Sequence, residues 1–265
     1  MNHILLVAAT PFEIAPTLSY LQENWAPHPS SAEEVGKNRT SAGQQTDLNA
    51  PVYARGSNDQ EQEQTLFHKG ETELKVLISG VGLTATAFAL GRASNTNPYR
   101  LAIQAGIGGA LDRSLALGQL VRVASDRFAD LGAEDQDGSL IDLQELGFMP
   151  EGSNSPFNPD GTLSPMDEQS QASLIDLPYV AGISVNKVHG STTSIERLRE
   201  KYPTAQVESM EGAAFFYACN VMGWPALQLR SISNYVEARD KTNWTIEEAI
   251  ASLNEGLIRL LDVLA

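Results

Sequence analysis

The sequence lacks the features of secreted, metal-binding and membrane-spanning proteins. Its single cysteine, Cys219, has no partner for a disulfide within the chain, and its four histidines show no metal-ligand spacing. No run of about eighteen apolar residues occurs, and no basic segment of a signal peptide precedes the apolar residues 4–9. We therefore expect a cytoplasmic protein with no membrane segment and no bound metal.

Basic residues are also scarce. The 265 residues include 18 Lys and Arg but 33 Asp and Glu, which gives a formal net charge of −15. Such an excess repels phosphate backbones and anionic lipid, so neither nucleic acid nor a membrane surface is the expected partner. Hydrophobic residues make up 42% of the chain, which is enough for the core of an α/β domain of this length.

Apolar runs of strand length alternate with helix signals along the chain. The run at 4–9 is continuous, as in strands that are buried on both faces of a parallel sheet. The predicted strands are 4–9, 74–79, 101–105, 119–125, 180–188, 205–209 and 225–233. The predicted helices begin at a capping box at 10–13, near Thr84, at a capping box at 193–196, at Glu211 and at Thr245. This alternation predicts an α/β fold.

Two segments depart from this pattern. Residues 28–65 contain few sizeable apolar residues, so we expect a polar surface insertion, with a short strand near Val52, in one domain that spans 1–265. Residues 130–178 are rich in Gly, Pro, Asp and Ser, and they predict a long irregular connection with helical stretches near Leu143 and Gln169.

Two glycine-rich turns are predicted after strands, at Gly80-Val81-Gly82 and at 106–109, which begins with Gly106. Glycine lets backbone N–H groups approach a ligand closely, although such turns also serve packing alone. The first turn matches a dinucleotide fingerprint, but the next strand ends without an acidic residue for a ribose, so we expect no nicotinamide and no other cofactor. Neither turn contains Lys or Arg, which disfavours phosphate and favours water as the nucleophile.

Polar side chains follow three predicted strands. Each of these residues has a structural explanation: a capping box for Glu13, a helix dipole for Glu211 and a turn for Asn234. Their shared position at the carboxyl ends of strands favours a common site. Glu208, inside or at the edge of its strand, is a less favoured substitute for Glu211, and Trp244 either covers an aromatic ligand or packs against the last helix.

The ordered motifs resemble the purine nucleosidase and phosphorylase superfamily. The motifs are Ala-Ala-Thr-Pro-Phe-Glu at 8–13, Ser-Gly-Val-Gly at 79–82, Gly-Ile-Gly-Gly at 106–109, Met-Glu-Gly-Ala at 210–213 and Arg-Ser-Ile-Ser-Asn at 230–234. Within the superfamily, the runs at 208–216 and 233–239 are similar to the futalosine hydrolases of the menaquinone pathway. The resemblance implies a nucleoside phosphorylase-like, three-layer α/β/α fold with a mixed twisted sheet, and hydrolysis of an N-glycosidic bond.

The resemblance also implies residue roles. In related adenosine-type nucleosidases the residue matching Glu13 activates water, the one matching Glu211 holds ribose hydroxyls, and the one matching Met210 packs on the sugar. Trp244 matches an aromatic residue that lines the site, and the glycine turns are expected to contact substrate. A homo-oligomer is expected, because relatives complete the site with a neighbouring subunit. This chain differs from those enzymes in carrying Asn234 where they have Asp, and in one extra residue at 207–211, which loosens the assignment of Glu208.

Asn234 favours a 6-oxopurine base. Its amide supplies an N–H donor to O6 or N7, whereas an ionised carboxylate would face the O6 acceptor with another acceptor. We therefore expect hydrolysis of futalosine, with hypoxanthine and dehypoxanthine futalosine as products, and Lys187 and Arg239 as candidates for binding its carboxylate. Three alternatives stay open: a methylthioadenosine or S-adenosylhomocysteine nucleosidase, a catalytically idle nucleoside-binding relative and, more distantly, a nicotinamide oxidoreductase.

Overall fold

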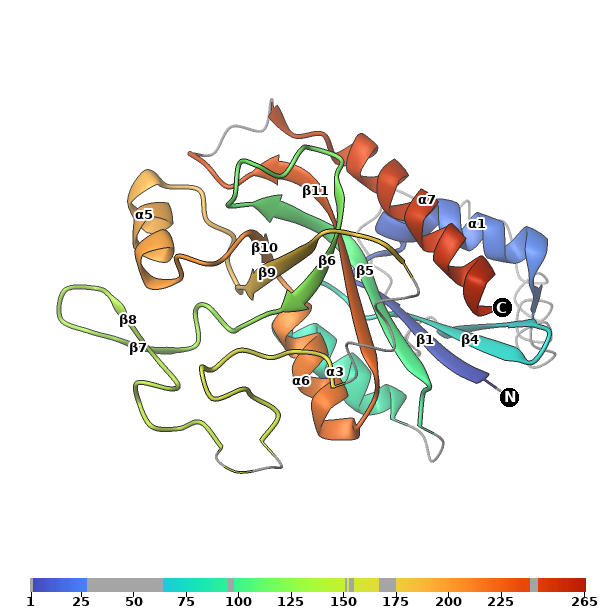
Figure 1. The fold of residues 1–265 in the computed structure, drawn as a ribbon, viewed down its shortest axis with the longest axis horizontal. Coiled ribbons are helices and arrows are strands. Elements are labelled where there is room, and N and C mark those ends of the chain that lie inside the picture. Colours follow the sequence, from blue (N-terminus) through green and yellow to red (C-terminus); the bar gives the residue numbers. More distant parts are fainter. Residues whose placement is uncertain are drawn as a thin grey trace, which may run out of the picture.

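A mixed nine-stranded sheet runs through the part of the protein that the computed structural model describes, namely residues 2–27, 64–94, 98–150, 152, 155–166, 175–238 and 243–265 (Figure 1). The strands of the described residues are β1 (Asn2–Ala8), β2 (Ala26–Pro27), β3 (Gln64–Lys69), β4 (Thr72–Ile78), β5 (Leu101–Ala110), β6 (Leu120–Ser125), β7 (Gly132–Glu134), β8 (Leu140–Asp142), β9 (Tyr179–Ser184), β10 (Val207–Ser209) and β11 (Ala226–Tyr235). Strands β7 and β8 form a separate two-stranded sheet. The helices are the 3-10 helix η1 (Pro11–Ile14), α1 (Ala15–Asn24), α3 (Leu83–Ala93), α5 (Thr192–Lys201), α6 (Gly212–Met222) and α7 (Ile246–Leu264).

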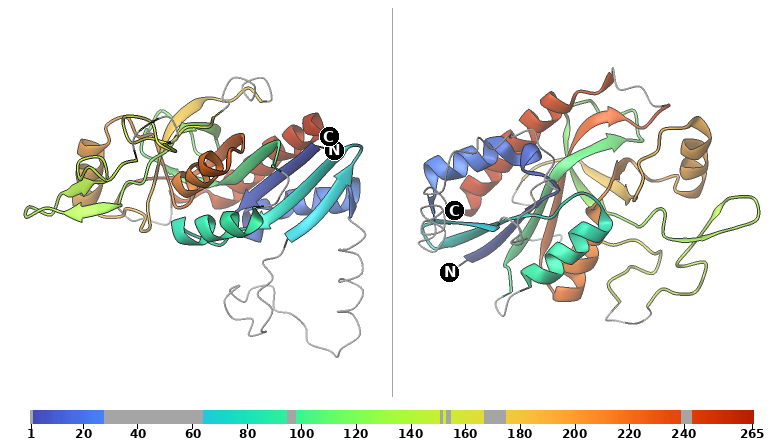
Figure 2. Two further views of the ribbon diagram at one scale, coloured as in Figure 1. Left: turned by 90° about the horizontal axis from the view of Figure 1, so that it is seen from below. Right: turned by 180° about the vertical axis from the view of Figure 1, so that it is seen from behind.

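The sheet lies between two helical layers, as predicted. Helices α1 and α7 cover one face, and α3 and α6 cover the other (Figures 1 and 2). The side chains of β1 alternate between the two faces, so that Leu6 packs in the core below α7 and Leu5 in the core below α6. This double burial explains why β1 is a continuous apolar run rather than an alternating one.

The strand order is β10-β9-β6-β11-β5-β1-β4-β3-β2, with both parallel and antiparallel pairs. Strand β5 pairs in parallel with β1 and β11, whereas β11 pairs with β6 in antiparallel fashion. Strand β10 pairs with β9 and also with the end of β5, which closes β5, β10, β9, β6 and β11 into a ring of strands. The ring brings segments near residues 106, 208 and 234 to one region.

The predicted turn at 106–109 is wrong, because β5 continues through it to Ala110. The glycines there serve close strand packing. A Cβ on Gly108 would lie 2.9 Å from Val207 Cγ1, and one on Gly109 would lie 2.9 Å from Val236 Cγ2. Glycine thus allows β10 and β11 to approach β5 closely.

Strand β11 also runs further than predicted. It includes Asn234, which therefore lies within the end of a strand rather than in a turn after it. The pairing with β5 shifts register between Ile232 and Asn234, and Asn234 then lies opposite Gly109. Such an irregularity redirects side chains near a strand end.

Smaller differences concern element starts. Helix α5 begins at Thr192 with Ser191 as its cap, so the predicted box at 193–196 is wrong. Thr245 does precede α7, but its hydroxyl bonds to the Ser233 carbonyl instead of capping the helix.

Turns after β8, and no helix, occupy the described residues around Leu143, and β3 was not predicted. The strand near Val52, the helix near Gln169 and nearly all of the 28–65 insertion lie outside the described residues.

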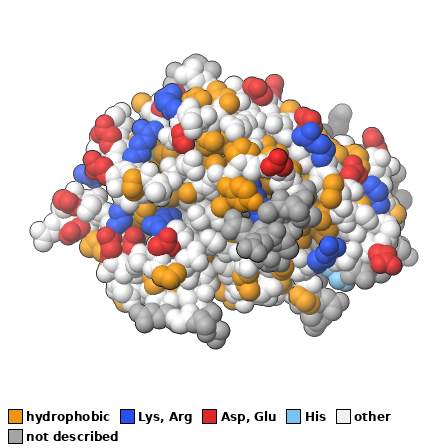
Figure 3. All heavy atoms as spheres, in the orientation of Figure 1, with side chains coloured by type: hydrophobic (Ala, Val, Ile, Leu, Met, Phe, Trp, Pro, Cys, Tyr) orange, Lys and Arg blue, Asp and Glu red, His pale blue; other side chains and the backbone are white. Residues whose placement is uncertain are grey.

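Charged side chains of both signs are interspersed on the face that Figure 3 shows, with Lys and Arg beside Asp and Glu. Among the described residues, no helix is long and apolar enough to cross a membrane. The described chain also contains no cluster of three or more His, Cys, Asp or Glu side chains that could hold a metal ion.

Candidate functional site

Glu13 is placed by the turn that follows β1. The predicted capping box is present: Thr10 Oγ1 accepts a hydrogen bond from the Glu13 N–H (3.4 Å), and Glu13 Oε2 accepts from the Thr10 N–H (3.1 Å). The second oxygen, Oε1, accepts from the N–H of Ile107 on β5 (3.2 Å). The carboxylate is buried, so the cap residue also reaches the centre of the sheet.

Glu211 precedes α6 and faces the glycine turn after β4. Its Oε1 accepts a hydrogen bond from the Gly82 N–H (3.1 Å). Gly80 and Gly82 have φ angles of 82° and 97°, a region that L-residues with side chains rarely adopt. The glycines therefore shape this turn so that it presents a backbone donor to a buried carboxylate.

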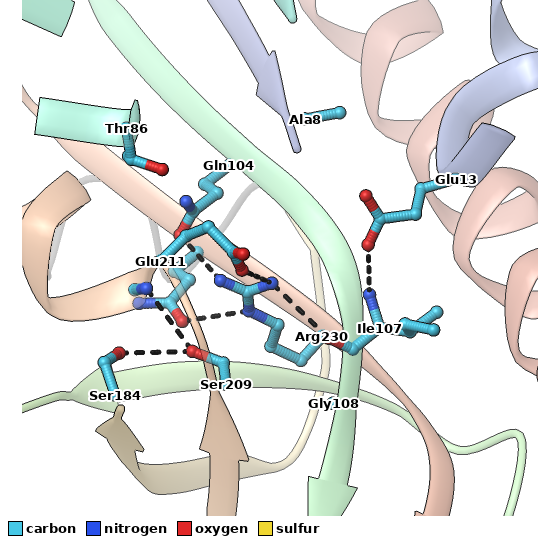
Figure 4. A network of polar contacts seen from close by, with 12 residues as sticks. Ala8, Glu13, Thr86, Gln104, Ile107, Gly108, Ser184, Ser209, Glu211 and Arg230 are labelled. Carbon is cyan, nitrogen blue, oxygen red and sulfur yellow. Dashed lines mark hydrogen bonds and ion pairs between the residues drawn. The ribbon is translucent and has the colours of Figure 1, made fainter. Parts of the chain in front are cut away.

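Arg230 of β11 lies between these acids and is 1% exposed. Its Nη1 forms an ion pair with Glu211 Oε2 (3.4 Å) and donates to the Ile107 carbonyl (3.4 Å), as Figure 4 shows. Its Nη2 donates to Gln104 Oε1 (3.0 Å), and its Nε donates to Gln228 Oε1 (3.2 Å). The guanidinium is therefore fixed on all sides.

Gly106 makes room for this arrangement. A Cβ at this position would lie 2.5 Å from Arg230 Nη1 and 3.1 Å from Glu13 Oε1. The absent side chain thus leaves the space in which the guanidinium and the Glu13 carboxylate meet beside the backbone of β5.

The surroundings favour proton uptake by Glu13. Burial is the largest cause that raises its pKa above the usual carboxyl value, and the nearby Glu211 carboxylate raises it further. Arg230, the Ile107 N–H and Thr10 oppose the rise. A carboxylate with a raised pKa is a stronger proton acceptor near neutral pH, which suits a general base.

A second layer supports Arg230. Gln228 Nε2 donates to Asp126 Oδ2 (3.2 Å), and Ser184 Oγ donates to Asp126 Oδ1 (2.9 Å). Burial raises the pKa of Asp126 to about 6. A Cβ on Gly212 would collide with Asp126 Oδ2, which explains the glycine after Glu211.

A pocket lies beyond this cluster, toward the ends of β5 and β11. Its lining residues are Gly109, Val188, His189, Glu208, Asn234, Tyr235, Glu237 and Trp244. Asn234 is held at both ends of its amide, because Oδ1 accepts from Ser233 Oγ (2.9 Å) and Nδ2 donates to the Tyr235 carbonyl (3.0 Å). With respect to the described residues, one N–H and one lone pair of this amide stay available for a ligand.

Comparison with known proteins gives the family. The family model described as "Phosphorylase superfamily" matches residues 42–265. The chain belongs to this superfamily. The chain is 32% identical over 194 residues to a futalosine hydrolase from Streptomyces coelicolor, with 71% of this chain and 79% of the relative covered. A futalosine hydrolase from Thermus thermophilus is 31% identical over 190 residues, with 70% and 80% covered.

Nucleosidases of the superfamily are also similar. A 5′-methylthioadenosine/S-adenosylhomocysteine nucleosidase from Colwellia psychrerythraea is 26% identical over 212 residues, with 73% of this chain and 81% of the relative covered. Among solved structures, the native futalosine hydrolase of Helicobacter pylori matches with a TM-score of 0.69 at 18% identity, covering 98% of both chains, which shows the shared fold. These matches identify the chain as an N-glycosidic nucleoside hydrolase, with a small-molecule nucleoside as substrate.

In this superfamily member, the structure groups the predicted residues in two neighbouring places. Glu13 and Glu211 meet around Arg230, whereas Asn234, Glu208 and Trp244 line the pocket. The remaining predicted residues lie around these places. The turn that holds Glu211 contains Gly80, Val81 and Gly82. Met210 is half-buried between β10 and Glu211, and Lys187 is exposed in the loop before Val188, outside the pocket lining. Arg239 lies outside the described residues.

Three functional candidates were not predicted from the sequence: Arg230, Gln104 and His189. The glycine turns contain no Lys or Arg, but Arg230 reaches the cluster from the neighbouring strand β11. The sequence did contain a signal for Arg230 and Gln104, because an Arg or Gln within an apolar strand is buried and needs polar partners. The identity of those partners depends on strand register, which places Gln228 opposite Gln104.

Proposed function

We propose that the protein hydrolyses the N-glycosidic bond of futalosine and releases hypoxanthine and dehypoxanthine futalosine. The observation that carries the proposal is the pair of buried carboxylates, Glu13 and Glu211, around one guanidinium beside a pocket that contains an amide, Asn234. The similarity to futalosine hydrolases at 31–32% identity supports this substrate over the adenosine-type substrates of the more distant nucleosidases.

Each acid has a distinct role in the proposed reaction. Glycosidic cleavage passes through an oxocarbenium-like state, with positive charge on the ribose and negative charge on the departing base. Glu13 accepts a proton from the water that attacks the anomeric carbon, as its raised pKa favours. Glu211 accepts hydrogen bonds from the ribose hydroxyls, and its charge stabilises the developing cation. Met210 packs on the sugar.

The charge balance favours water over phosphate as nucleophile. Arg230 already bonds to Glu211, Gln104, Gln228 and the Ile107 carbonyl. Its single positive charge faces two carboxylates, Glu13 and Glu211, so the cluster carries a net negative charge when both are ionised. A phosphate dianion would be repelled there, whereas a neutral water molecule is not.

Asn234 accounts for the choice of base. Its remaining N–H is suited to O6 or N7 of hypoxanthine, and the two hydrogen bonds that hold the amide fix its direction. Trp244 lines the same pocket and offers an aromatic surface for the purine.

The test is chromatography of the products after incubation with futalosine, inosine and methylthioadenosine, each with and without phosphate. We expect hypoxanthine from futalosine at a rate that phosphate does not change. Adenine release from methylthioadenosine exceeding hypoxanthine release from futalosine would overturn the substrate, and dependence on phosphate would overturn hydrolysis.

Replacing Asn234 by Ala tests its role directly. Loss of a donor at developing charge costs about 3 kcal/mol, or roughly a hundredfold in kcat. Because the charge develops only in the transition state, KM should change much less. Steady-state kinetics on futalosine measure both constants, and equal losses in kcat and KM would refute the role.

We also propose Lys187 and Arg239 as candidates for binding the substrate carboxylate. A homo-oligomeric assembly is a further part of the proposal. Lys187 is exposed beside the pocket residue Val188, so its ammonium has room to reach a ligand that extends from the pocket.

A further inference from the structure

Half-buried His189 and buried Glu208 form a pair in the wall of the pocket. Glu208 Oε1 accepts a hydrogen bond from the backbone N–H of His189 (3.1 Å), and its Oε2 contacts His189 Nδ1 at short range. The side chains are 16% and 3% exposed, respectively. One carboxylate therefore holds both the backbone and the ring of His189.

This contact fixes which ring nitrogen is available. An ionised carboxylate only accepts hydrogen bonds, so Nδ1 of His189 carries the hydrogen that it shares with Glu208. The other nitrogen, Nε2, makes no hydrogen bond to the described part of the chain, and His189 lines the pocket together with Asn234 and Trp244. The pair thus presents Nε2 as the ring atom that is free to meet a ligand.

The other polar groups that face this pocket from the described elements are already engaged. Glu237 forms an ion pair with Arg113, and the Tyr235 hydroxyl donates to the Leu115 carbonyl (3.1 Å). Asn234 can donate a hydrogen bond, but an amide does not release a proton at neutral pH. Among the described lining residues, imidazole is the group suited to carrying and releasing a proton near neutrality.

We propose, on the basis of the function proposed above, that His189 is the general acid that protonates the departing purine and that Glu208 is its positioning residue. As the bond between the anomeric carbon and N9 breaks, its electron pair passes to the base, and the proton on His189 Nε2 passes to N7. Water forms the new bond to the anomeric carbon and gives a proton to Glu13. His189 loses one proton and Glu13 gains one, and exchange with solvent restores both.

The proposal explains how a neutral amide can stand at position 234. Asn234 orients the base, and the proton comes from His189 in the same lining. Glu208 holds the ring in place through Nδ1 and through the His189 backbone N–H. Lys187, two residues before His189, is exposed, and among the described residues no ion pair joins it to Glu208.

The test compares kcat for futalosine across pH in the wild type and in His189→Gln, Glu208→Gln and His3→Gln. His3 is a matched control, because its Nδ1 also bonds to a carboxylate, Glu73 (2.8 Å), but on β1 and β4. We expect His189→Gln to lower kcat by about 10²–10³-fold and to abolish the decline of kcat at alkaline pH. Glu208→Gln should lower kcat on futalosine less than His189→Gln does, and His3→Gln should leave both kcat and that decline unchanged.

A second substrate separates proton donation from folding. The base of 7-methylinosine carries a positive charge and leaves without being protonated, so His189→Gln should cleave it at nearly the wild-type rate. The proposal is overturned if His189→Gln retains both kcat on futalosine and the alkaline decline, or if it loses activity equally on both substrates. If the wild-type protein releases no hypoxanthine from futalosine, the proposed function itself is overturned. The wild type alone gives this result, so it is distinguishable from a failure of the His189 proposal.

Discussion

In the proposed reaction, Glu13 has two tasks that place conflicting demands on one carboxylate. As part of a capping box it must bond to Thr10, and as a base it must keep an oxygen near the nucleophile. Burial and the neighbouring Glu211 raise its pKa, so protonation on acidification begins at a higher pH than for an ordinary carboxyl group. The ionised form is the active one, since only it can accept a proton from water.

The raised pKa of Glu13 predicts how kcat depends on pH. We expect kcat to fall as the pH decreases through the raised pKa of Glu13, which lies above the ordinary value of 4.5. Glu13→Gln should lower kcat by about 10²–10⁴-fold and remove this acid limb. Steady-state rates from acidic to neutral pH measure both effects, with Glu23→Gln on the exposed face of α1 as the control. An unchanged acid limb in Glu13→Gln would assign the limb to another group.

Gly106 tests the packing of the charged cluster. In Gly106→Ala the new methyl group would lie 2.5 Å from Arg230 Nη1, and the four hydrogen bonds of Arg230 leave it little freedom to move. We expect kcat to fall by about a hundredfold, because misplaced catalytic groups cost a factor of this order. Far-ultraviolet circular dichroism should show that the fold is retained.

Gly91→Ala is the matched control. A Cβ at Gly91 of α3 meets no atom within 4 Å, so kcat should stay unchanged and the free energy of unfolding should rise by about 1 kcal/mol. If Gly106→Ala kept the wild-type kcat, the reaction would not depend on the position of Arg230.

At the scale of elements, α7 holds Glu13 through a single buried amide. Asn254 Nδ2 donates to the Glu13 carbonyl (2.8 Å), and its Oδ1 accepts from the N–H and the hydroxyl of Thr17 (3.0 and 2.6 Å). These bonds join the end of the chain to the η1–α1 junction. The position of the proposed base therefore depends on the last helix.

Asn254→Ala should reveal this dependence. It leaves the Glu13 carbonyl and the Thr17 donors without partners, which costs about 2–4 kcal/mol in the free energy of unfolding. Urea denaturation measures this loss, and kcat should fall with it because η1 is released. Asn24→Ala at the exposed end of α1 should change stability by less than about 0.5 kcal/mol. A stable and fully active Asn254→Ala protein would show that α7 does not position Glu13.

Local signals predicted the elements that carry the acids. The apolar run of β1, the capping box that contains Glu13 and the helix that follows Glu211 are all encoded within about ten residues. The strand character of 106–109 was missed because it depends on pairing with β10 and β11, far away in the chain. Glycine runs look like turns when the close approach of a distant strand is unknown.

At the scale of the whole molecule, strand closure assembles the site. The pairing of β10 with both β9 and β5 brings His189 and Glu208 to the pocket that Asn234 lines from β11. No local pattern contains this pairing, so the role proposed for His189 could not be predicted from its isolated position in the sequence. The buried Arg230 is held by partners from several elements, namely the Glu211 carboxylate, the amides of Gln104 and Gln228 and the Ile107 carbonyl.

In the proposed complex the sugar lies at the Glu13–Glu211 cluster while the base lies in the pocket. A crystal structure of the Glu13→Gln variant with bound futalosine tests this placement. We expect the hypoxanthine ring against Trp244 with its O6 or N7 bonded to Asn234, and the ribose hydroxyls bonded to Glu211. A base bound outside this pocket, or ribose hydroxyls beyond hydrogen-bond distance of Glu211, would contradict it.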